Sequence, residues 1–312
     1  MLKQKKYLIP LIIIYTILIT VLIVTAISPQ IDYSVSKALT SGVNQGESSG
    51  TVTLGNIIEI WAEPVPLLPI CFVIAMCAVY CIRIRDKGVL PKLIGFALTA
   101  GGAVLSWQIV YRVVKYYVRL TDITKFWLAS EAKPAFIIKL VCAVAGVGLM
   151  FLFLFVSSKI KQDLLVQLQR VMMFIIIALL AELAIVEGIK LVCGRMRYRE
   201  WIGDTSSGYW PWYRINGKPD GDGFKSFPSG HTASASLLLP LTFIFNAVGK
   251  EKAGRYARIC VLCWVLFVMT TRIMAGAHFL SDVCAGALIT VTITAVTGAI
   301  IFRDGKFVSD KQ

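Results

Sequence analysis

The chain of 312 residues contains only two histidines, His231 and His278. Each stands where a polar segment meets an apolar run, His231 in FKSFPSGHTASAS and His278 in TTRIMAGAHFLSD. Two imidazoles can divide a group transfer between a nucleophile and a proton donor. Asp282 follows His278 by four residues, so on a helix its carboxylate lies on the same face and can accept a hydrogen bond from one ring nitrogen. The three residues are therefore a candidate catalytic group.

Cationic side chains stand at the same kind of junction. Lys190 lies near the end of an apolar run, Arg197 follows it by seven positions, and Arg272 precedes His278 by six. Guanidinium groups bind phosphate oxygens through two parallel hydrogen bonds. Taken singly, Lys190 and Arg272 could instead extend to the membrane interface, and Asp282 could simply cap a helix. The whole set at four span ends favours a phosphate site.

The residues directly before His231 suit an anion as well. Ser229 and Gly230 stand at a predicted helix start, where backbone N–H groups have no partner within the helix. Gly230 has no Cβ, so the backbone can approach a ligand closely. We therefore expect this helix start to contribute to the phosphate site.

The composition is that of a membrane protein. Hydrophobic residues make up 57% of the chain and charged residues 16%, with a mean hydropathy of +0.73. Soluble domains contain about 45–50% apolar and about 25% charged residues. The net charge of +14 could indicate a nucleic-acid partner, but membrane proteins also collect Lys and Arg in their loops. We therefore expect a bilayer and no nucleic acid as the partner.

Eight apolar runs approach the length of about 20 residues that a membrane-spanning helix needs. Three prolines crowd the start of the second run and make it the least regular. The predicted fold class is all-α, a polytopic transmembrane helix bundle. Its predicted spans are 7–28, 64–82, 93–114, 135–156, 171–192, 232–248, 259–276 and 280–301.

Positive charge predicts the orientation of these spans. If the N-terminus is cytoplasmic and the spans alternate, the inner segments are short and basic and hold 17 of the 32 Lys and Arg residues. Both termini are then cytoplasmic, and every candidate site residue lies on the outer face of the plasma membrane. The outer loops 115–134 and 193–230 are basic too. The Lys and Arg side chains of these loops are either simply solvated beside acidic residues or form an anion-binding surface.

The eight cysteines indicate packing rather than redox or metal chemistry. Seven of them fall in apolar runs, and Cys193 lies near a loop. Cys260 and Cys263 form a CxxC pair inside ARICVLCWVLFVM, with no histidine or second pair nearby. We therefore predict no disulfide framework and no zinc site.

Three ordered motifs carry a resemblance to a known family. The chain reads KLVCGRMRY at 190–198, PSGH at 228–231 and TRIMAGAHFLSD at 271–282. These are similar to the motifs KxxxxxxRP, PSGH and SRxxxxxHxxxD of the type 2 phosphatidic acid phosphatase (PAP2) superfamily. That superfamily includes membrane lipid phosphatases and, more distantly, soluble acid phosphatases and vanadium haloperoxidases. Tyr198 replaces the motif proline and Thr271 the motif serine.

The resemblance implies a role for each motif residue. His278 is the nucleophile, Asp282 orients it, and His231 protonates the leaving oxygen. No metal and no cofactor is expected, because cations neutralise the phosphate charge. The residues that hold the phosphoryl oxygens are Lys190, Arg197, Ser229, Gly230 and Arg272.

The resemblance also implies a domain organisation. Residues 1–90 form an N-terminal extension of two spans, residues 91–302 a six-helix PAP2 core, and residues 303–312 a cytoplasmic tail. The motifs explain nothing about the two extra spans. Oligomeric state is not predicted by any pattern in the sequence.

The expected activity is hydrolysis of a lipid phosphate or diphosphate monoester at the outer leaflet through a phosphohistidine. Undecaprenyl diphosphate, phosphatidylglycerophosphate and phosphatidic acid all fit as substrates. A lipid-linked phosphotransferase would use the same site. A lipid or ion transporter is a weaker alternative. A transporter is expected to carry ionisable groups at mid-membrane, and Glu182 and Glu187 in the fifth predicted span are the only acids of this kind. A homologue with a binding role only is disfavoured by the intact motif positions.

The predicted orientation can be tested by cysteine labelling in a background without the native cysteines. A cysteine at Ser48 or Ser206 should react with an impermeant reagent added from outside, because both positions fall in predicted outer loops. A cysteine at Ser158 should not react until the membrane is permeabilised. Labelling of Ser158 in intact cells would reverse the orientation and place the site in the cytoplasm.

Overall fold

The computed structural model describes residues 5–40, 58, 60–62, 64–83, 88–120, 133–203 and 208–307. Every regular element in these ranges is helical, and this confirms the predicted all-α class. The probe positions Ser48 and Ser206 lie outside the described residues. The helices are α1 (Lys5–Ile27), α2 (Pro29–Thr40), α4 (Pro64–Arg83), α5 (Val89–Leu120), α7 (Lys133–Ser158), α8 (Gln162–Cys193), α9 (Tyr198–Gly203), the 3₁₀ turn η2 (Asp222–Phe224), α10 (Gly230–Ser236), α11 (Leu238–Leu241), α12 (Phe243–Ala247), α13 (Glu251–Met274) and α14 (Leu280–Ile301).

Seven helices in the described ranges are long and apolar enough to cross a membrane, so the chain is a multi-pass membrane protein. They coincide with seven of the eight predicted spans. Several extend beyond the apolar run that predicted them, because a helix continues through polar turns that hydropathy does not detect. Helix α8, for example, begins at Gln162, well before the apolar run that starts at residue 171.

The eighth predicted span, 232–248, is not one continuous helix. Three short helices, α10, α11 and α12, occupy this stretch instead. Pro240 lies within it and has no N–H to donate to the carbonyl of residue 236, which removes one hydrogen bond from an α-helical ladder at this point. The prediction of one uninterrupted helix is therefore wrong here.

The prolines at the start of α4 are accommodated as helix geometry allows. Pro64 is the first residue of α4 and Pro66 lies in its first turn. The first four N–H groups of a helix have no partner within the helix, so these two positions lose nothing by lacking a donor. Pro64 and Pro66 therefore mark the start of this span, whereas Pro69 lies inside the helix.

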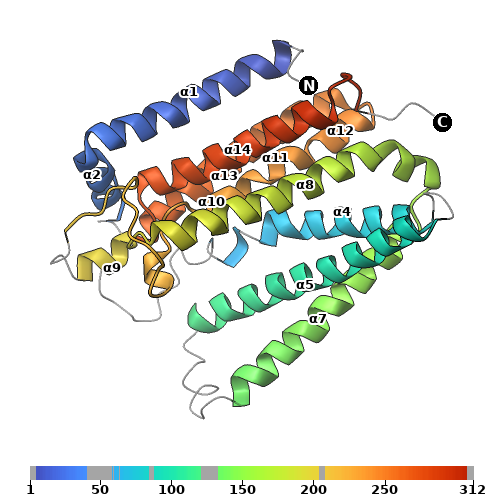
Figure 1. Cartoon of the computed structure of the whole chain (residues 1–312), viewed down its shortest axis with the longest axis horizontal. Helices are drawn as coiled ribbons and strands as arrows, with labels where there is room; N and C mark the ends of the chain where they lie inside the picture. The colour runs from blue at the N-terminus through green and yellow to red at the C-terminus, as the bar shows by residue number, and fades with distance from the viewer. Residues whose placement is uncertain are drawn as a thin grey trace. The chain divides into compact units, whose positions relative to one another are not determined.

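The chain divides into two compact units. One consists of residues 63–177, 240–257 and 306–312, and in it α4, α5 and α7 pack against one another (Figure 1). Gly146 on α7 makes this close packing possible, because a Cβ there would lie 2.5 Å from the backbone of Trp107 on α5.

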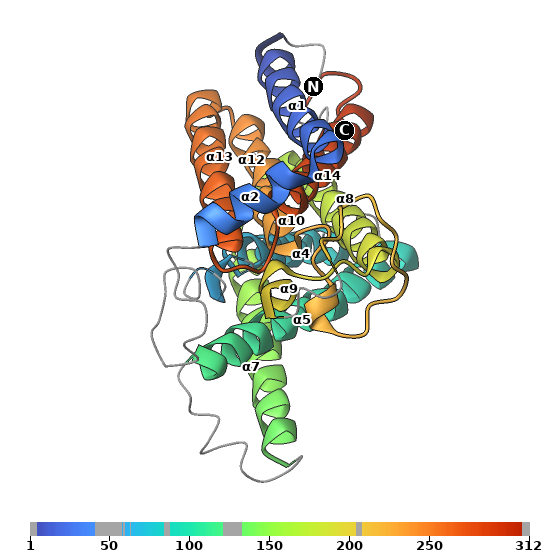
Figure 2. The same cartoon turned by 90° about the vertical axis from the view of Figure 1, so that its left-hand side faces the viewer.

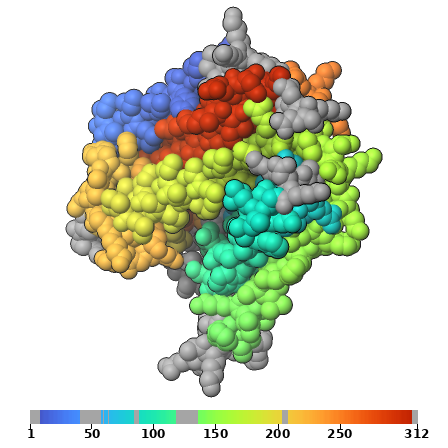
Figure 3. Space-filling model, turned by 45° about the vertical axis from the view of Figure 1, so that its right-hand side comes forward, coloured from blue at the N-terminus to red at the C-terminus, as the bar shows by residue number. Residues whose placement is uncertain are grey.

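The other unit consists of residues 1–62, 178–239 and 258–305 and contains every predicted site residue. In it α1 runs alongside α14, and the Tyr15 hydroxyl donates a hydrogen bond of 2.8 Å to Thr292 Oγ1 (Figures 1 and 2). Figure 3 shows the blue α1–α2 segment lying against the red α14.

Helix α2 crosses the site end of this unit. The Thr40 hydroxyl donates to the carbonyl of Ile273 at 3.1 Å, near the end of α13, and Asp32 contacts the first turn of α14. The N-terminal helices α1 and α2 therefore pack on the helices that carry the motifs. The domain boundaries at residues 90 and 302 stay a prediction.

Candidate active site

The PSGH segment and the start of α14 are joined through their backbones. The Ser229 N–H donates to the carbonyl of Asp282 at 3.0 Å. A Cβ at Gly286, one turn further along α14, would lie 2.5 Å from the Ser229 carbonyl oxygen, so only glycine permits this approach. Ser229 is the N-cap of α10, and its Oγ accepts a hydrogen bond from Thr232 Oγ1 at 3.1 Å. The second and third motifs therefore form one rigid corner.

Lys190 reaches this corner from the end of α8. A Cβ added at Gly230 would lie 2.7 Å from Lys190 Nζ, so the ammonium group lies directly against the glycine backbone. Its Nζ is also 2.6 Å from Glu187 Oε1, and the lysine side chain is 14% exposed. The structure thus brings the first motif to the second, with His231 buried in the next position of α10.

His278 lies in the short segment between α13 and α14 and is 3% exposed. Its Nδ1 is 2.8 Å from the carbonyl oxygen of Ser226. A carbonyl can only accept, so Nδ1 carries the proton and Nε2 retains its lone pair. The imidazole is therefore held in the tautomer that a nucleophile at Nε2 requires.

The hydrogen bond predicted between His278 and Asp282 is not formed. Asp282 Oδ2 lies 3.7 Å from His278 Nδ1, beyond hydrogen-bond distance. That oxygen instead accepts hydrogen bonds from the Ser226 hydroxyl at 2.6 Å and from the Phe279 N–H at 2.8 Å. The spacing of four residues placed the carboxylate on the correct side, but the capping geometry of α14 directs its oxygens to nearer donors.

Burial lowers the pKa of His278 to about 4, and the positive charges of Arg197 and Arg272 act in the same direction. The carboxylate of Asp282 opposes this shift in the pKa and only partly offsets it. The imidazole is therefore neutral at pH 7, the form in which its lone pair can attack phosphorus.

Arg197 and Arg272 hold their positions from two different elements. The Arg197 N–H donates to the carbonyl of Gly223 at 2.8 Å. Arg272 is fully buried in the last turn of α13. The charges of both arginines lower the pKa of His278, so the motif arginines act electrostatically on the imidazole. The structure thus gathers the predicted residues at the ends of α8, α10, α13 and α14.

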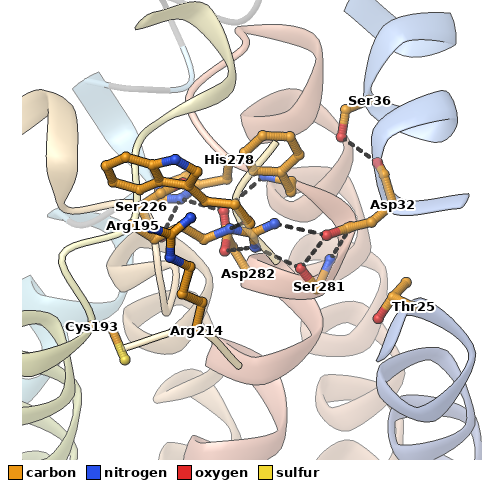
Figure 4. A network of polar contacts seen from close by, with 12 residues as sticks. Thr25, Asp32, Ser36, Cys193, Arg195, Arg214, Ser226, His278, Ser281 and Asp282 are labelled. Atoms are coloured by element: carbon orange, nitrogen blue, oxygen red, sulfur yellow. Dashed lines mark hydrogen bonds and ion pairs between the residues drawn. The ribbon is translucent and has the colours of Figure 1, made fainter. Parts of the chain in front are cut away.

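Arg195 has a different environment from its neighbour Arg197. It is fully buried, and its Nη1 donates to Asp282 Oδ1 at 2.6 Å and to Ser281 Oγ at 2.7 Å (Figure 4). Its Nη2 is 3.0 Å from Asp32 Oδ2. The guanidinium carbon lies 4.2 Å from the centroid of the Phe279 ring. Arg195 is therefore engaged by two carboxylates and is not directed to a ligand.

Tyr209 completes this network. Its hydroxyl accepts a hydrogen bond from Arg195 Nη2 at 2.8 Å and donates one to Asp32 Oδ2 at 2.7 Å. Burial raises the pKa of Tyr209, so the hydroxyl keeps the proton that it donates. The ring also packs on Phe279 with centroids 5.4 Å apart.

Sequence reasoning missed Asp32, Tyr209, Ser226 and Ser281 and left the role of Arg195 open. Asp32 is the first acidic residue in the chain and follows the first apolar run directly, which is the one signal that could have drawn attention to it. Its partners lie far away in sequence, and no local pattern predicts such a pairing. The Ser226 carbonyl cannot be identified from a side-chain motif at all.

The two departures from the family motifs are structurally explained. Tyr198 begins α9, is buried, and packs edge-on against Phe279 with centroids 5.6 Å apart. This contact fixes the backbone next to Arg197, where the family has a proline. The Thr271 hydroxyl donates to the carbonyl of Val268 at 2.9 Å within α13 and so stays within its own helix.

Within the described ranges, no three His, Cys, Asp or Glu side chains come together as a metal site would require. The charged groups around His278 are chiefly cations, which suit phosphate oxygens. The fold and the site together define a helical membrane protein that gathers the motif cations and a buried histidine at the ends of its long helices.

Residues 171–306 match the model of the PAP2 superfamily. This match supports membership of the PAP2 superfamily, as the three motifs predicted. Members are generally phosphatases of phosphate esters, which assigns phosphatase chemistry to the protein in that general sense. Comparisons with curated proteins and with solved structures gave no match. The matched segment includes all eight predicted site residues but not Asp32.

The structure predicts different consequences for the neighbouring arginines. Arg197→Ala should fold normally and lose on the order of 10²-fold in phosphate release, because it removes a donor close to the reacting group. Arg195→Ala should unfold readily, because two buried carboxylates lose their partner at a cost of about 3–5 kcal/mol. Thermal unfolding in detergent and phosphate release per folded molecule separate the two effects.

Arg199→Ala is the matched control. Its side chain is 29% exposed and pairs only loosely with Glu200 at 3.5 Å, so activity and unfolding temperature should stay near wild type. Wild-type stability in Arg195→Ala would contradict the buried network. Wild-type activity in Arg197→Ala would contradict the placement of that arginine in the site.

Proposed function

We propose that the protein is an integral-membrane lipid phosphatase that hydrolyses a lipid phosphate or diphosphate monoester at the outer leaflet. The observation that carries the proposal is the buried, neutral His278, whose protonated Nδ1 lies 2.8 Å from the Ser226 carbonyl oxygen and whose pKa is lowered by the charges of Arg197 and Arg272. This arrangement suits attack by Nε2 on a phosphoryl group.

The reaction proceeds in two steps. Nε2 of His278 forms a bond to phosphorus while the ester P–O bond breaks, and His231 gives its proton to the departing oxygen. Water then attacks phosphorus and gives a proton to the now neutral His231, the N–P bond breaks, and inorganic phosphate leaves. Lys190, Arg197 and Arg272, with Ser229 and the Gly230 backbone, hold the phosphoryl oxygens during both steps. The scheme requires no metal and no cofactor.

A lipid rather than a soluble ester is favoured by the position of the site. The catalytic residues lie at the ends of long apolar helices, where headgroups of a bilayer are found. The segment after α9 carries Trp210, Trp212 and Tyr213, and the Arg214 guanidinium lies 5.2 Å from the Trp210 ring centroid. Aromatic residues with adjacent cations are typical of the membrane interface. The lipid alternatives remain undecaprenyl diphosphate, phosphatidylglycerophosphate and phosphatidic acid.

Hydrolysis and phosphotransfer differ only in the acceptor. Purified protein should release inorganic phosphate from at least one of these lipids with no acceptor present. A second lipid or sugar alcohol added in excess should not divert the phosphate. Transfer to the alcohol without release of free phosphate would favour a phosphotransferase, and the absence of both would overturn the proposed function.

The roles of the two histidines can be separated by the leaving group. His278→Ala should abolish turnover of every substrate, because no phosphoenzyme forms. His231→Ala should be slow on a lipid monophosphate but should regain part of its rate on p-nitrophenyl phosphate, whose leaving group needs little protonation. Phosphate release by both variants from alkyl and aryl esters measures this. Rescue of His278→Ala by the aryl ester, and not of His231→Ala, would mean that the roles are reversed.

A further inference from the structure

We propose that Asp32 on α2 is a positioning residue for the reaction, supplied by the N-terminal segment outside the PAP2 match, and that it acts through Arg195 and Asp282 on His278. The inference rests on the proposed function of His278 as the nucleophile. It assigns a purpose to an N-terminal helix that the family motifs leave unexplained.

The carboxylate of Asp32 is built into the site. It is fully buried in the first turn of α2. Its Oδ1 accepts the Ser281 N–H at 2.8 Å, and its Oδ2 accepts the Ser281 hydroxyl at 2.5 Å and the Tyr209 hydroxyl at 2.7 Å. Arg195 adds a fourth donor at 3.0 Å. A buried carboxylate is tolerated only when it is paired and hydrogen-bonded in this way.

Asp32 therefore fixes the first turn of α14 from outside that helix. Ser281, which it holds by both backbone and side chain, stands between His278 and Asp282 in the same turn. Displacing Ser281 would shift the Asp282 carboxylate and with it the contact to Ser226 (Figure 4). The contact of that carboxylate to the Phe279 N–H, beside His278 in the chain, would shift as well.

The charges of the network give Asp32 a second effect. Arg195 is shared between two carboxylates, so the buried group carries one net negative charge. When Nε2 of His278 bonds to phosphorus and Nδ1 keeps its proton, the ring becomes positively charged. Asp282, 3.7 Å from Nδ1, is the acid closest to that charge in the network. Without the charge of Asp32, the positive charge of Arg195 would cancel the negative charge of Asp282. The positively charged phosphohistidine would then lose its attraction to the network.

The test uses the full-length protein with Asp32→Asn, which preserves the shape of the side chain and removes its charge. We expect kcat on the lipid substrate to fall about 10- to 100-fold, the range that loss of an outer-shell partner costs in other sites. KM should change by less than about threefold, because Asp32 does not contact the substrate. The rate of phosphoenzyme formation in a single turnover should fall by the same factor as kcat.

Ser36→Ala is the matched control on the same helix. Ser36 is also fully buried and lies one turn after Asp32, but its hydroxyl donates only to the Asp32 carbonyl at 2.9 Å. Its kcat should stay within about twofold of wild type, because the charge network is unchanged. A fall in both variants would indicate general damage to α2 and would overturn the specific role of the carboxylate.

Tyr209→Phe keeps the test decisive if Asp32→Asn does not fold. It removes the hydrogen bond to Asp32 and the one from Arg195 without a change in charge, and kcat should fall severalfold with the fold retained. Wild-type kcat in Asp32→Asn, or an unfolded Asp32→Asn together with wild-type kcat in Tyr209→Phe, would show that the network serves stability alone. Failure of the wild-type protein to form any phosphoenzyme would instead overturn the proposed function.

Discussion

The burial of one guanidinium group organises the catalytic end of this protein. Arg195 is removed from water in a membrane protein, and a buried cation of this kind persists only when carboxylates and hydrogen-bond acceptors surround it. Asp32 and Asp282 supply the two carboxylates from helices at opposite ends of the sequence. The Trp210 carbonyl accepts the remaining Nε–H at 2.9 Å. The N-terminal helices, the segment after α8 and the start of α14 are therefore tied together by a single side chain.

This constraint reaches His278 through the backbone as well as through charge. The Ser226 N–H donates to the Arg195 carbonyl at 3.0 Å, and the Ser226 carbonyl accepts the imidazole Nδ1–H at 2.8 Å. The Ser226 hydroxyl donates to Asp282 Oδ2 at 2.6 Å. One serine thus connects the buried ion pair to the nucleophile. The tautomer of His278 is set by a structural network and does not require a bound ligand.

Much of this arrangement follows from sequence alone. Seven apolar runs became helices close to the predicted positions, and the three motifs meet, as the predicted alternation of the spans implied. Hydropathy and local spacing succeed here because a bilayer demands long apolar helices and because each motif is short. Pro240 is visible inside the eighth apolar run, but hydropathy carries no information about its missing N–H donor.

The rest required three-dimensional contacts. The pairing of Asp32 with Arg195 joins residues 163 positions apart, and no periodicity encodes it. The i and i+4 spacing of His278 and Asp282 predicted proximity but not the competing donors that occupy the carboxylate. Spacing thus identified which residues meet, whereas the full set of nearby donors and acceptors decides which atoms bond.

The most direct measurement for this account is detection of the covalent intermediate. The protein would be mixed with a radiolabelled phosphate ester, quenched in alkali within a single turnover, and the modified peptide identified by mass spectrometry. The account predicts an alkali-stable, acid-labile phosphoryl group on His278 that is absent from His278→Ala. A phosphoryl group found on His231, or on a residue other than histidine, would contradict it.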